Sequence, residues 1–148
     1  GAVINISSIA AVRTAPGSGY YAASKCALEG MTEGLYLETA PLGIKVMIVE
    51  PGAFRTDFAG RSLTQSKTAI GDYGETAGTR RIENDKTHGT HPGDPDKGAG
   101  LIIEAIEAED TPLRLLLGRD AVKVAGAVLD NRKNEYDKWR EFSSRSDF

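Results

Sequence analysis

The sequence predicts an α/β fold built on a parallel sheet. Three short runs of mostly apolar, often β-branched residues lie at 2–7, 44–49 and 113–117. Such runs, with few charges, are typical of strands that are buried on both faces. Between them lie two segments with helical periodicity. A strand–helix–strand–helix–strand order is the pattern of a parallel sheet with crossover helices.

Length and composition indicate one ordinary domain. The 148 residues suffice for a substantial core, and with 40% hydrophobic and 26% charged residues the net charge is only -3. Nothing here favours binding to nucleic acid or to anionic membranes. No run of ~20 apolar residues that could span a membrane occurs, and we expect no signal peptide. Cys26 is the only cysteine. No intrachain disulfide can form, and we expect a reducing, cytoplasmic location.

The first predicted strand, residues 2–7, leads into the serine pair Ser7-Ser8. Ligands of open α/β sheets bind at the carboxyl ends of the strands, so Ser8 is well placed for chemistry. The alternative is that the two serines only end the strand by bonding local backbone. With a tyrosine thirteen residues further on, we assign catalysis to Ser8 and a structural role to Ser7.

Residues 10–19 are predicted to form a loop, because turn-forming residues cluster there. By residue type and spacing alone, a dinucleotide-binding fingerprint is matched by Gly17-x-Gly19-x-x-Ala22. That fingerprint needs its first glycine directly after a strand, whereas about ten residues intervene here. We therefore do not interpret it as a phosphate-binding loop.

Residues 20–40 have a helical pattern, which Pro41 and Gly43 end. Tyr21 and Lys25 are four residues apart, so on a helix they share one face. A free tyrosine has a pKa of about 10, and a cation fixed nearby favours the phenolate. The spacing therefore predicts a pair suited to proton transfer.

Other interpretations of this helix remain open. Lys25 could instead form a surface ion pair with Glu29. We expect Tyr20 to be a packing residue and Cys26 to be a small buried one. The small residues of the helix would let another helix approach closely: Ala22, Ala23, Ala27, Gly30 and Gly34.

The second strand, residues 44–49, follows the helix through a crossover that is nearly always right-handed. Pro51 and Gly52 then end it. This pair is often only a turn, but at the carboxyl edge of a sheet a turn also exposes backbone groups to a ligand.

Three motifs, taken together, resemble those of the short-chain dehydrogenase/reductase family. They are Asn5-Ile6-Ser7-Ser8, Tyr21-x-x-x-Lys25 and Pro51-Gly52-x-x-x-Thr56. A lone Tyr-x-x-x-Lys is a weak signal, but three linked motifs in the family's order and spacing are specific. The resemblance covers the first 60 residues or so closely. It implies that residues 1–148 form a single partial domain, the C-terminal half of a Rossmann-type doubly wound parallel sheet.

The resemblance implies reversible hydride transfer between NAD or NADP and a carbonyl or alcohol. Tyr21 would give or take the proton, Lys25 would favour the phenolate and hold the cofactor ribose, and Ser8 would orient the substrate oxygen. The complete protein would be a homodimer or homotetramer.

Besides Tyr21 and Lys25, the resemblance implies cofactor contacts for the turn after the second strand, where Pro51, Gly52 and Thr56 would lie at the cofactor. The Phe54 backbone would bind the nicotinamide carboxamide. Phe54 stands where the family more often has Val or Ile, and a backbone contact tolerates that change.

The chain also departs from the family. The glycine-rich phosphate loop and the residue that selects NAD or NADP are not in it, and we expect them upstream of Gly1, where no initiator methionine stands. A second hypothesis is a truncated, inactive half-domain that serves only for packing or oligomerisation. A third is a truncated reading frame without a stable product.

The segment 57–92 is long and polar, with one short helix expected near 57–66. By position it would be the family's substrate-binding lid, although a solvated insert is the alternative. His88 and His91 could suggest a metal. Without a cysteine or a convincing acidic partner nearby, we expect no metal site.

The end of the chain should supply a helix, a strand and a helix. Asp94 and Pro95 predict a helix start, with the helix continuing to about Ala108. Its buried stripe would be Leu101, Ile102, Ala105 and Ile106. The third strand, residues 113–117, precedes a final helix at 120–139 that is apolar early and charged late.

Overall fold

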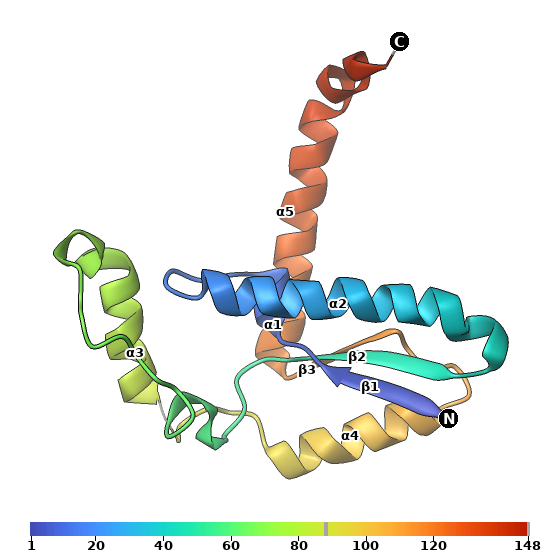
Figure 1. The fold of residues 1–148 in the computed structure, drawn as a ribbon, viewed down its shortest axis with the longest axis horizontal. Coiled ribbons are helices and arrows are strands. Elements are labelled where there is room, and N and C mark those ends of the chain that lie inside the picture. Colours follow the sequence, from blue (N-terminus) through green and yellow to red (C-terminus); the bar gives the residue numbers. More distant parts are fainter. Residues whose placement is uncertain (88, 148) are drawn as a thin grey trace.

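The computed structural model describes residues 1–87 and 89–147, and it contains a parallel three-stranded sheet. The strands are β1 (Ala2–Ile6), β2 (Lys45–Pro51) and β3 (Arg114–Leu117), in the order β1-β2-β3. Helix α2 (Gly19–Thr39) connects β1 to β2, and α4 (Pro95–Glu107) precedes β3. Figure 1 shows α2 and α4 on opposite faces of the sheet. The α/β fold with a parallel sheet is confirmed.

The central strand β2 is the most buried element of the chain. Its residues from Val46 to Glu50 are all buried. β1 pairs with it from Ala2 opposite Lys45 to Ile6 opposite Val49, and β3 pairs with its second half. Since successive side chains of a strand point to opposite faces, β2 supplies both layers of the core.

The face towards α4 is apolar. Met47, Val49 and Leu117 are buried there, and partly buried residues of the strands and of α4 pack against them: Ile4, Ile102, Ala105, Ile106 and Leu115. The predicted stripe on α4 is thus confirmed for three residues but wrong for Leu101, which is 52% exposed. Buried Gly98 puts the centre of the stripe on the line through Ile102, so Leu101 lies beside it.

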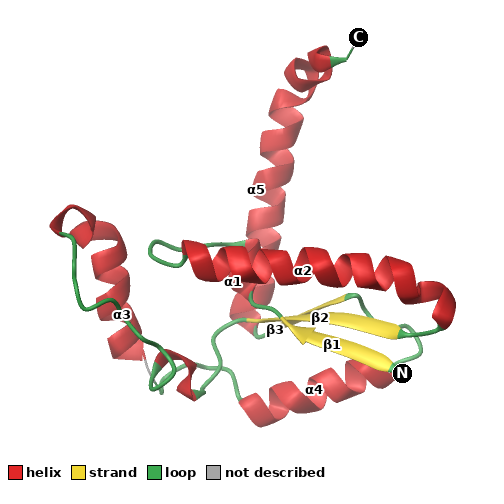
Figure 2. Ribbon diagram, in the orientation of Figure 1, coloured by secondary structure: helices red, strands yellow, loops and turns green. Residues whose placement is uncertain are grey.

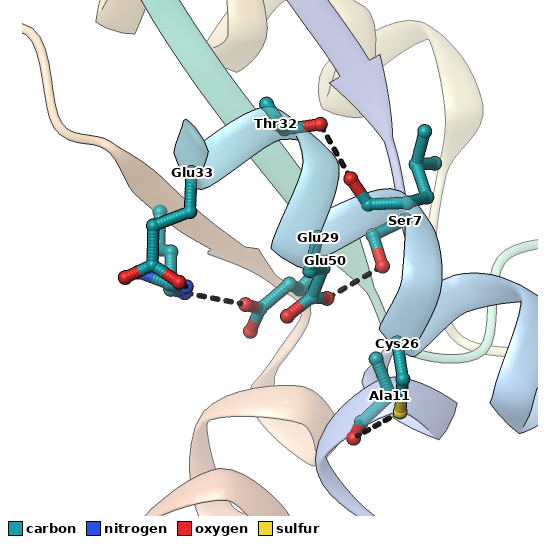
Figure 3. Close-up of polar contacts among 9 residues, drawn as sticks. Ser7, Ala11, Cys26, Glu29, Thr32, Glu33 and Glu50 are labelled. Carbon is teal, nitrogen blue, oxygen red and sulfur yellow. Dashed lines mark hydrogen bonds and ion pairs between the residues drawn. The ribbon is translucent and has the colours of Figure 1, made fainter. Parts of the chain in front are cut away.

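The face towards α2 buries Val46 and Ile48, which alternate with Met47 and Val49 along β2, but it also holds the buried polar contacts drawn in Figure 3, and we call it the polar face for that reason. The Asn5 amide donates to Thr32 Oγ1 over 2.8 Å, and the Ser7 hydroxyl donates to Glu29 Oε1 over 2.5 Å. Ser7 and Thr32 are buried. Buried polar groups without partners are costly, so these bonds are what allow polar side chains to lie between a helix and a sheet.

Glu50 is a buried carboxylate on the same polar face, only 3% exposed. Burial raises the pKa of the Glu50 carboxyl, the charge of Glu29 raises it further, and Arg114 opposes both. Arg114 Nε lies 3.7 Å from Glu50 Oε1, and another nitrogen of Arg114 lies 3.2 Å from Glu33. Arg114 therefore bridges the buried carboxylate to a half-exposed one on α2.

The region around the first turn of α2 differs from the prediction. The expected loop at 10–19 begins with a short helix, α1 (Ile9–Val12), which Ser8 caps. Tyr20 is 98% exposed and Cys26 is exposed, so neither is the packed residue that was expected. The stripe of α2 that faces the sheet includes Lys25 and Glu29, which leaves Tyr20 outside it. The Cys26 thiol donates to the Ala11 carbonyl at 3.3 Å.

The segment 57–92 contains more helix than expected. It has short turns at η2 (Asp57–Ala59), η3 (Gly71–Tyr73) and η4 (Gly74–Gly78), followed by α3 (Thr79–Thr87). The prediction missed α3 because the helix is polar almost all round, so no apolar period signals it. Figure 2 shows α3 standing apart from the sheet.

The final helix, α5 (Arg119–Ser143), is longer than the predicted 120–139 and is followed by η5 (Ser144–Ser146). Asp137 pairs with Lys133 and with Arg140, one turn away on either side. Such pairs at i,i+3 and i,i+4 support a charged helix end. Figure 1 shows this end of α5 projecting away from the sheet. Within the described ranges, no helix has the length and apolar character to cross a membrane.

Candidate active site

The carboxyl end of β1 carries the serine pair. Ser7 N–H donates to the Val49 carbonyl at 2.7 Å, which continues the sheet pairing beyond Ile6. Ser8 is the N-cap of α1, where its Oγ accepts from Ala10 N–H at 3.1 Å. This is the local backbone role of the alternative interpretation. The cap uses one lone pair of the hydroxyl, so the Ser8 O–H remains able to donate to a substrate oxygen.

Tyr21 and Lys25 lie on one face at the start of α2, as their spacing predicts. Lys25 Nζ is 5.8 Å from the centroid of the Tyr21 ring and donates to the Ile6 carbonyl at 2.9 Å. Glu29, which the alternative paired with Lys25, accepts instead from Ser7. The lysine is therefore tied to the end of β1, two residues before Ser8, and the ion-pair interpretation is wrong.

A ring from the following segment covers Tyr21. The centroids of Tyr21 and Phe58 are 5.6 Å apart, with the ring planes tilted by 48°. Phe58 lies in η2, directly after the turn that ends β2, and it is 56% exposed. This contact brings the start of the 57–92 segment to the candidate catalytic tyrosine. Sequence reasoning did not single out Phe58.

The turn after β2 is held from two sides. Gly52 N–H donates to the Leu117 carbonyl at 2.8 Å, which links the turn to β3. Gly93 N–H donates to the Ala53 carbonyl at 3.0 Å, and Arg55 N–H donates to the Gly93 carbonyl at 2.8 Å. These two bonds form an isolated parallel bridge between Phe54 and Gly93. Neighbouring backbone groups are thus fixed on both sides of Phe54.

Phe54 itself presents a free backbone donor. Because Ala53 and Arg55 make the bonds to Gly93, the N–H and C=O of Phe54 point to the other side. Its carbonyl accepts from Thr56 N–H at 3.0 Å, while its N–H has no hydrogen-bond partner among the described residues. Such a group can bind a ligand carbonyl at the sheet edge.

The Phe54 ring explains two glycines in later segments. A Cβ at Gly93 would lie 2.7 Å from the ring, and one at Gly98 would lie 2.8 Å from it. Thr56 caps η2, since its Oγ1 accepts from Phe58 N–H at 3.3 Å. Pro51 is the last residue of β2 and pairs with Leu117. All four predicted residues of this turn therefore belong to one ordered structure at the sheet edge.

The structure adds a residue that sequence reasoning missed. Asp120, in the first turn of α5, accepts from Ala53 N–H through Oδ2 at 2.8 Å. The signal available in the sequence was an acidic residue two positions after Gly118, at the carboxyl end of the third predicted strand, where ligand-binding edges gather polar groups.

The metal question rests on the two histidines. His88 lies outside the described residues. His91 contributes its backbone carbonyl to Arg55 Nε at 3.1 Å. Over residues 1–87 and 89–147, no three His, Cys, Asp or Glu side chains gather as a metal site would need.

Comparison with known proteins gives a consistent family signal. Residues 1–67 match the family described as short chain dehydrogenase. Over 146 residues the chain is 36% identical to Oxidoreductase BOA17 of Botryotinia fuckeliana, covering 99% of this chain and 53% of that protein. The chain thus spans about half the length of this curated relative.

Solved structures show the same half-length match. A short-chain dehydrogenase from Streptomyces avermitilis superposes with a TM-score of 0.87 at 42% identity, over 100% of this chain and 53% of that one. A short chain dehydrogenase from Burkholderia cenocepacia, in complex with NADP, gives a TM-score of 0.54 at 30% identity, over 79% and 44% of the two chains.

Proposed function

Because residues 1–67 belong to the short-chain dehydrogenase family, we propose that the chain carries the catalytic residues of an NAD(P)-dependent oxidoreductase. Its reaction would be hydride transfer between the nicotinamide and a carbonyl or alcohol. One observation supports this most directly: Lys25 Nζ is fixed on the Ile6 carbonyl, beside the Tyr21 ring and two residues before Ser8. Packing alone does not require that arrangement.

The three catalytic side chains have distinct tasks. Tyr21 donates a proton to the carbonyl oxygen in reduction and accepts it in oxidation. Lys25 places its positive charge 5.8 Å from the centroid of the Tyr21 ring and holds the cofactor ribose. The Ser8 hydroxyl donates a hydrogen bond to the substrate oxygen, where negative charge develops in the transition state.

The residues of the β2 turn suit a nicotinamide cofactor, which supplies or accepts the hydride when bound. The unpartnered Phe54 N–H is a donor for the carboxamide oxygen. Lys25 uses one of its three donors on Ile6, which leaves two for ribose hydroxyls. Pro51, Gly52 and Thr56 shape the turn that the cofactor contacts. The NADP in the Burkholderia cenocepacia relative supports this choice of cofactor class.

We also propose that residues 1–148 correspond to the C-terminal half of a Rossmann domain. The chain spans about half the length of the relatives, and the order of its three motifs favours the C-terminal half. β1 is an edge strand of the described sheet, so a further strand could pair with it. In this proposal the phosphate loop and the choice between NAD and NADP belong to the other half.

The exposed face of α2 supports assembly into a homodimer or homotetramer. Met31 and Leu37 are 67% and 69% exposed, and nothing lies within 4 Å of a Cβ added at Gly30 or Gly34. A second helix could approach this face closely. The cytoplasmic location stays a prediction, and it rests on the single cysteine, Cys26.

We propose that the segment 57–92 forms the substrate lid. Its first residues reach the active site through the contact of Phe58 with Tyr21. Exchanging the segment for that of a relative should change which carbonyl compounds are reduced, while cofactor affinity stays similar. An unchanged substrate profile with altered stability would mean that the segment is only a solvated insert.

The catalytic proposal is tested by a neighbouring pair of tyrosines in the full-length protein. Tyr21→Phe deletes the proton donor and should lower turnover by ~10²–10⁴-fold, the usual worth of general acid–base catalysis. Tyr20→Phe is the matched control, because Tyr20 is 98% exposed, and it should leave turnover unchanged. Steady-state kinetics with NADH and NADPH measure the turnover of both variants and of the unmodified enzyme. Turnover of Tyr21→Phe within about threefold of the unmodified enzyme would contradict the assignment of Tyr21 as the proton donor.

A further inference from the structure

The carboxylate of Asp120 lies inside the turn that ends β2. Asp120 comes from the first turn of α5, sixty-seven positions after Ala53, yet its Oδ2 accepts from Ala53 N–H at 2.8 Å. A hydrogen bond to a charged acceptor is roughly twice as strong as one between neutral groups. The contact therefore ties the β3–α5 junction to the β2 turn.

Two glycines make room for this carboxylate. A Cβ at Gly52 would lie 2.4 to 2.6 Å from the three carboxyl atoms of Asp120, and a Cβ at Gly118 would lie 2.6 Å from its Oδ1. Gly52 has no positive φ, so its backbone conformation does not demand glycine. The close approach of the Asp120 carboxylate is what requires glycine at this position. The glycine of the Pro51-Gly52 motif is thus explained by a side chain far away in the sequence.

The bonds on either side of Phe54 decide where its free N–H points. On one side Ala53 is fixed twice, by its N–H on Asp120 and by its carbonyl on Gly93. On the other side Arg55 N–H is fixed on Gly93. Removing Asp120 would release the Gly52–Ala53 peptide, whose N–H it holds. The Ala53–Phe54 peptide would then be fixed only by its carbonyl bond to Gly93, and the Phe54 N–H would be held less firmly in its direction.

We propose that Asp120 is a positioning residue for the nicotinamide end of the cofactor. It acts through Ala53 and holds the Phe54 N–H towards the carboxamide oxygen, without touching the cofactor itself. This inference rests on the proposed function, because it assigns the Phe54 donor to a nicotinamide. It predicts that Asp120 matters for the nicotinamide and not for the rest of the dinucleotide.

The test compares two ligands by calorimetric titration into the full-length protein. One is the reduced cofactor that the unmodified protein binds, NADH or NADPH. The other is ADP-ribose, or its 2′-phosphate for NADPH, which lacks the nicotinamide. Asp120→Ala should weaken cofactor binding about tenfold, the scale of one lost charged hydrogen bond, and leave the shortened ligand within about twofold.

Two variants serve as controls. Asp120→Asn keeps an acceptor oxygen in the same place and should recover most of the cofactor affinity. Asp130→Ala removes an exposed carboxylate from the same helix and should change neither ligand. A purely structural role for Asp120 would shift both ligands together, so the ratio of the two affinities separates positioning from stability.

The possible outcomes distinguish a failure of the proposed function from a failure of the role inferred for Asp120. If the unmodified protein bound neither NADH nor NADPH, both the proposed function and this inference would be contradicted. If it bound the cofactor but Asp120→Ala weakened both ligands equally, or neither, the inference alone would be overturned. Should Asp120→Ala not fold, Gly52→Ala is the substitute, since its Cβ displaces the carboxylate. The same selective loss would support the inference, and an equal loss would overturn it.

Discussion

The two faces of the sheet differ in the buried contacts that join them to their helices. The face towards α4 buries Met47, Val49 and Leu117 against an apolar stripe of that helix. The face towards α2 buries Ser7, Thr32 and Glu50, and polar contacts bind the helix to the strands. Apolar contact is non-directional, whereas a hydrogen bond fixes which groups face each other. Both faces gain stability from apolar burial, since Val46 and Ile48 lie on the α2 side. Only the second face adds hydrogen bonds that set the position of its helix.

The position of α2 matters because the helix carries Tyr21 and Lys25. Four residues on one stripe of the helix each contact a group of the sheet: Lys25 with the Ile6 carbonyl, Glu29 with Ser7, Thr32 with Asn5, and Glu33 with Arg114. A slip of the helix along β1 would break all four contacts together. We infer that the polar face keeps the proposed catalytic pair, Tyr21 and Lys25, aligned with the end of β1.

The largest expected effect on stability comes from the apolar face. Met47→Ala removes a fully buried side chain and should lower the free energy of unfolding by about 2–5 kcal/mol. Ile103→Ala, on the exposed side of α4, is the control and should cost far less. Denaturant unfolding measures both. At a temperature where Met47→Ala stays folded, its turnover should be close to that of the unmodified enzyme. A loss of turnover in the folded variant would show that the apolar face also positions the site.

A smaller effect on stability, with a clearer effect on activity, is expected from the polar face. Thr32→Val keeps the shape but leaves the Asn5 amide without its acceptor, at a cost of about 1–3 kcal/mol. Because the lost hydrogen bond loosens the position of α2 on the sheet, the turnover of Thr32→Val should fall. The turnover of Met47→Ala should stay close to that of the unmodified enzyme. Steady-state kinetics on both folded variants make the comparison. Equal turnover in the two would show that the polar contacts do not align the helix.

Sequence reasoning predicted what depends on local pattern. The three strands, α2 and α4 follow from runs, periodicity and caps, and the spacing of Tyr21 and Lys25 placed both on one helical face. Asp94, which caps α4 through bonds to Asp96 and Lys97, has the expected role. These features need only residues near one another in the chain.

What could not be predicted depends on partners far apart in the sequence. Asp120 meets Ala53 only because β2 and β3 are neighbours in the sheet, and its place just after the third strand does not reveal which residue it would contact. Cys26 was expected to be buried, but it is exposed although its thiol contacts the Ala11 carbonyl of α1. The assignment of Ser8, Tyr21 and Lys25 to catalysis and of Pro51, Gly52, Phe54 and Thr56 to the cofactor stays a prediction.

The smallest expected effect concerns Glu50, the buried carboxylate of the polar face. Its pKa is raised above the ordinary value of 4.5, chiefly by burial and also by Glu29. Between pH 4.5 and that raised pKa the folded protein holds a proton that the unfolded chain has lost. The contribution of Glu50 to stability is therefore fully present below pH 4.5 and is lost as the pH rises through the folded pKa.

Glu50→Gln removes this titration, so the variant should match the unmodified protein below pH 4.5 and be the more stable of the two at neutral pH. The gain should be small, roughly 1 kcal/mol or about 2–4 °C in Tm, because Arg114 loses one of its two acidic partners. Glu107→Gln, at the exposed end of α4, should leave the pH dependence as it is. Melting temperatures across this range provide the measurement. If Glu50→Gln were less stable at neutral pH, the pairing with Arg114 would outweigh the cost of burial, and the polar face would be held by charge as well as by hydrogen bonds.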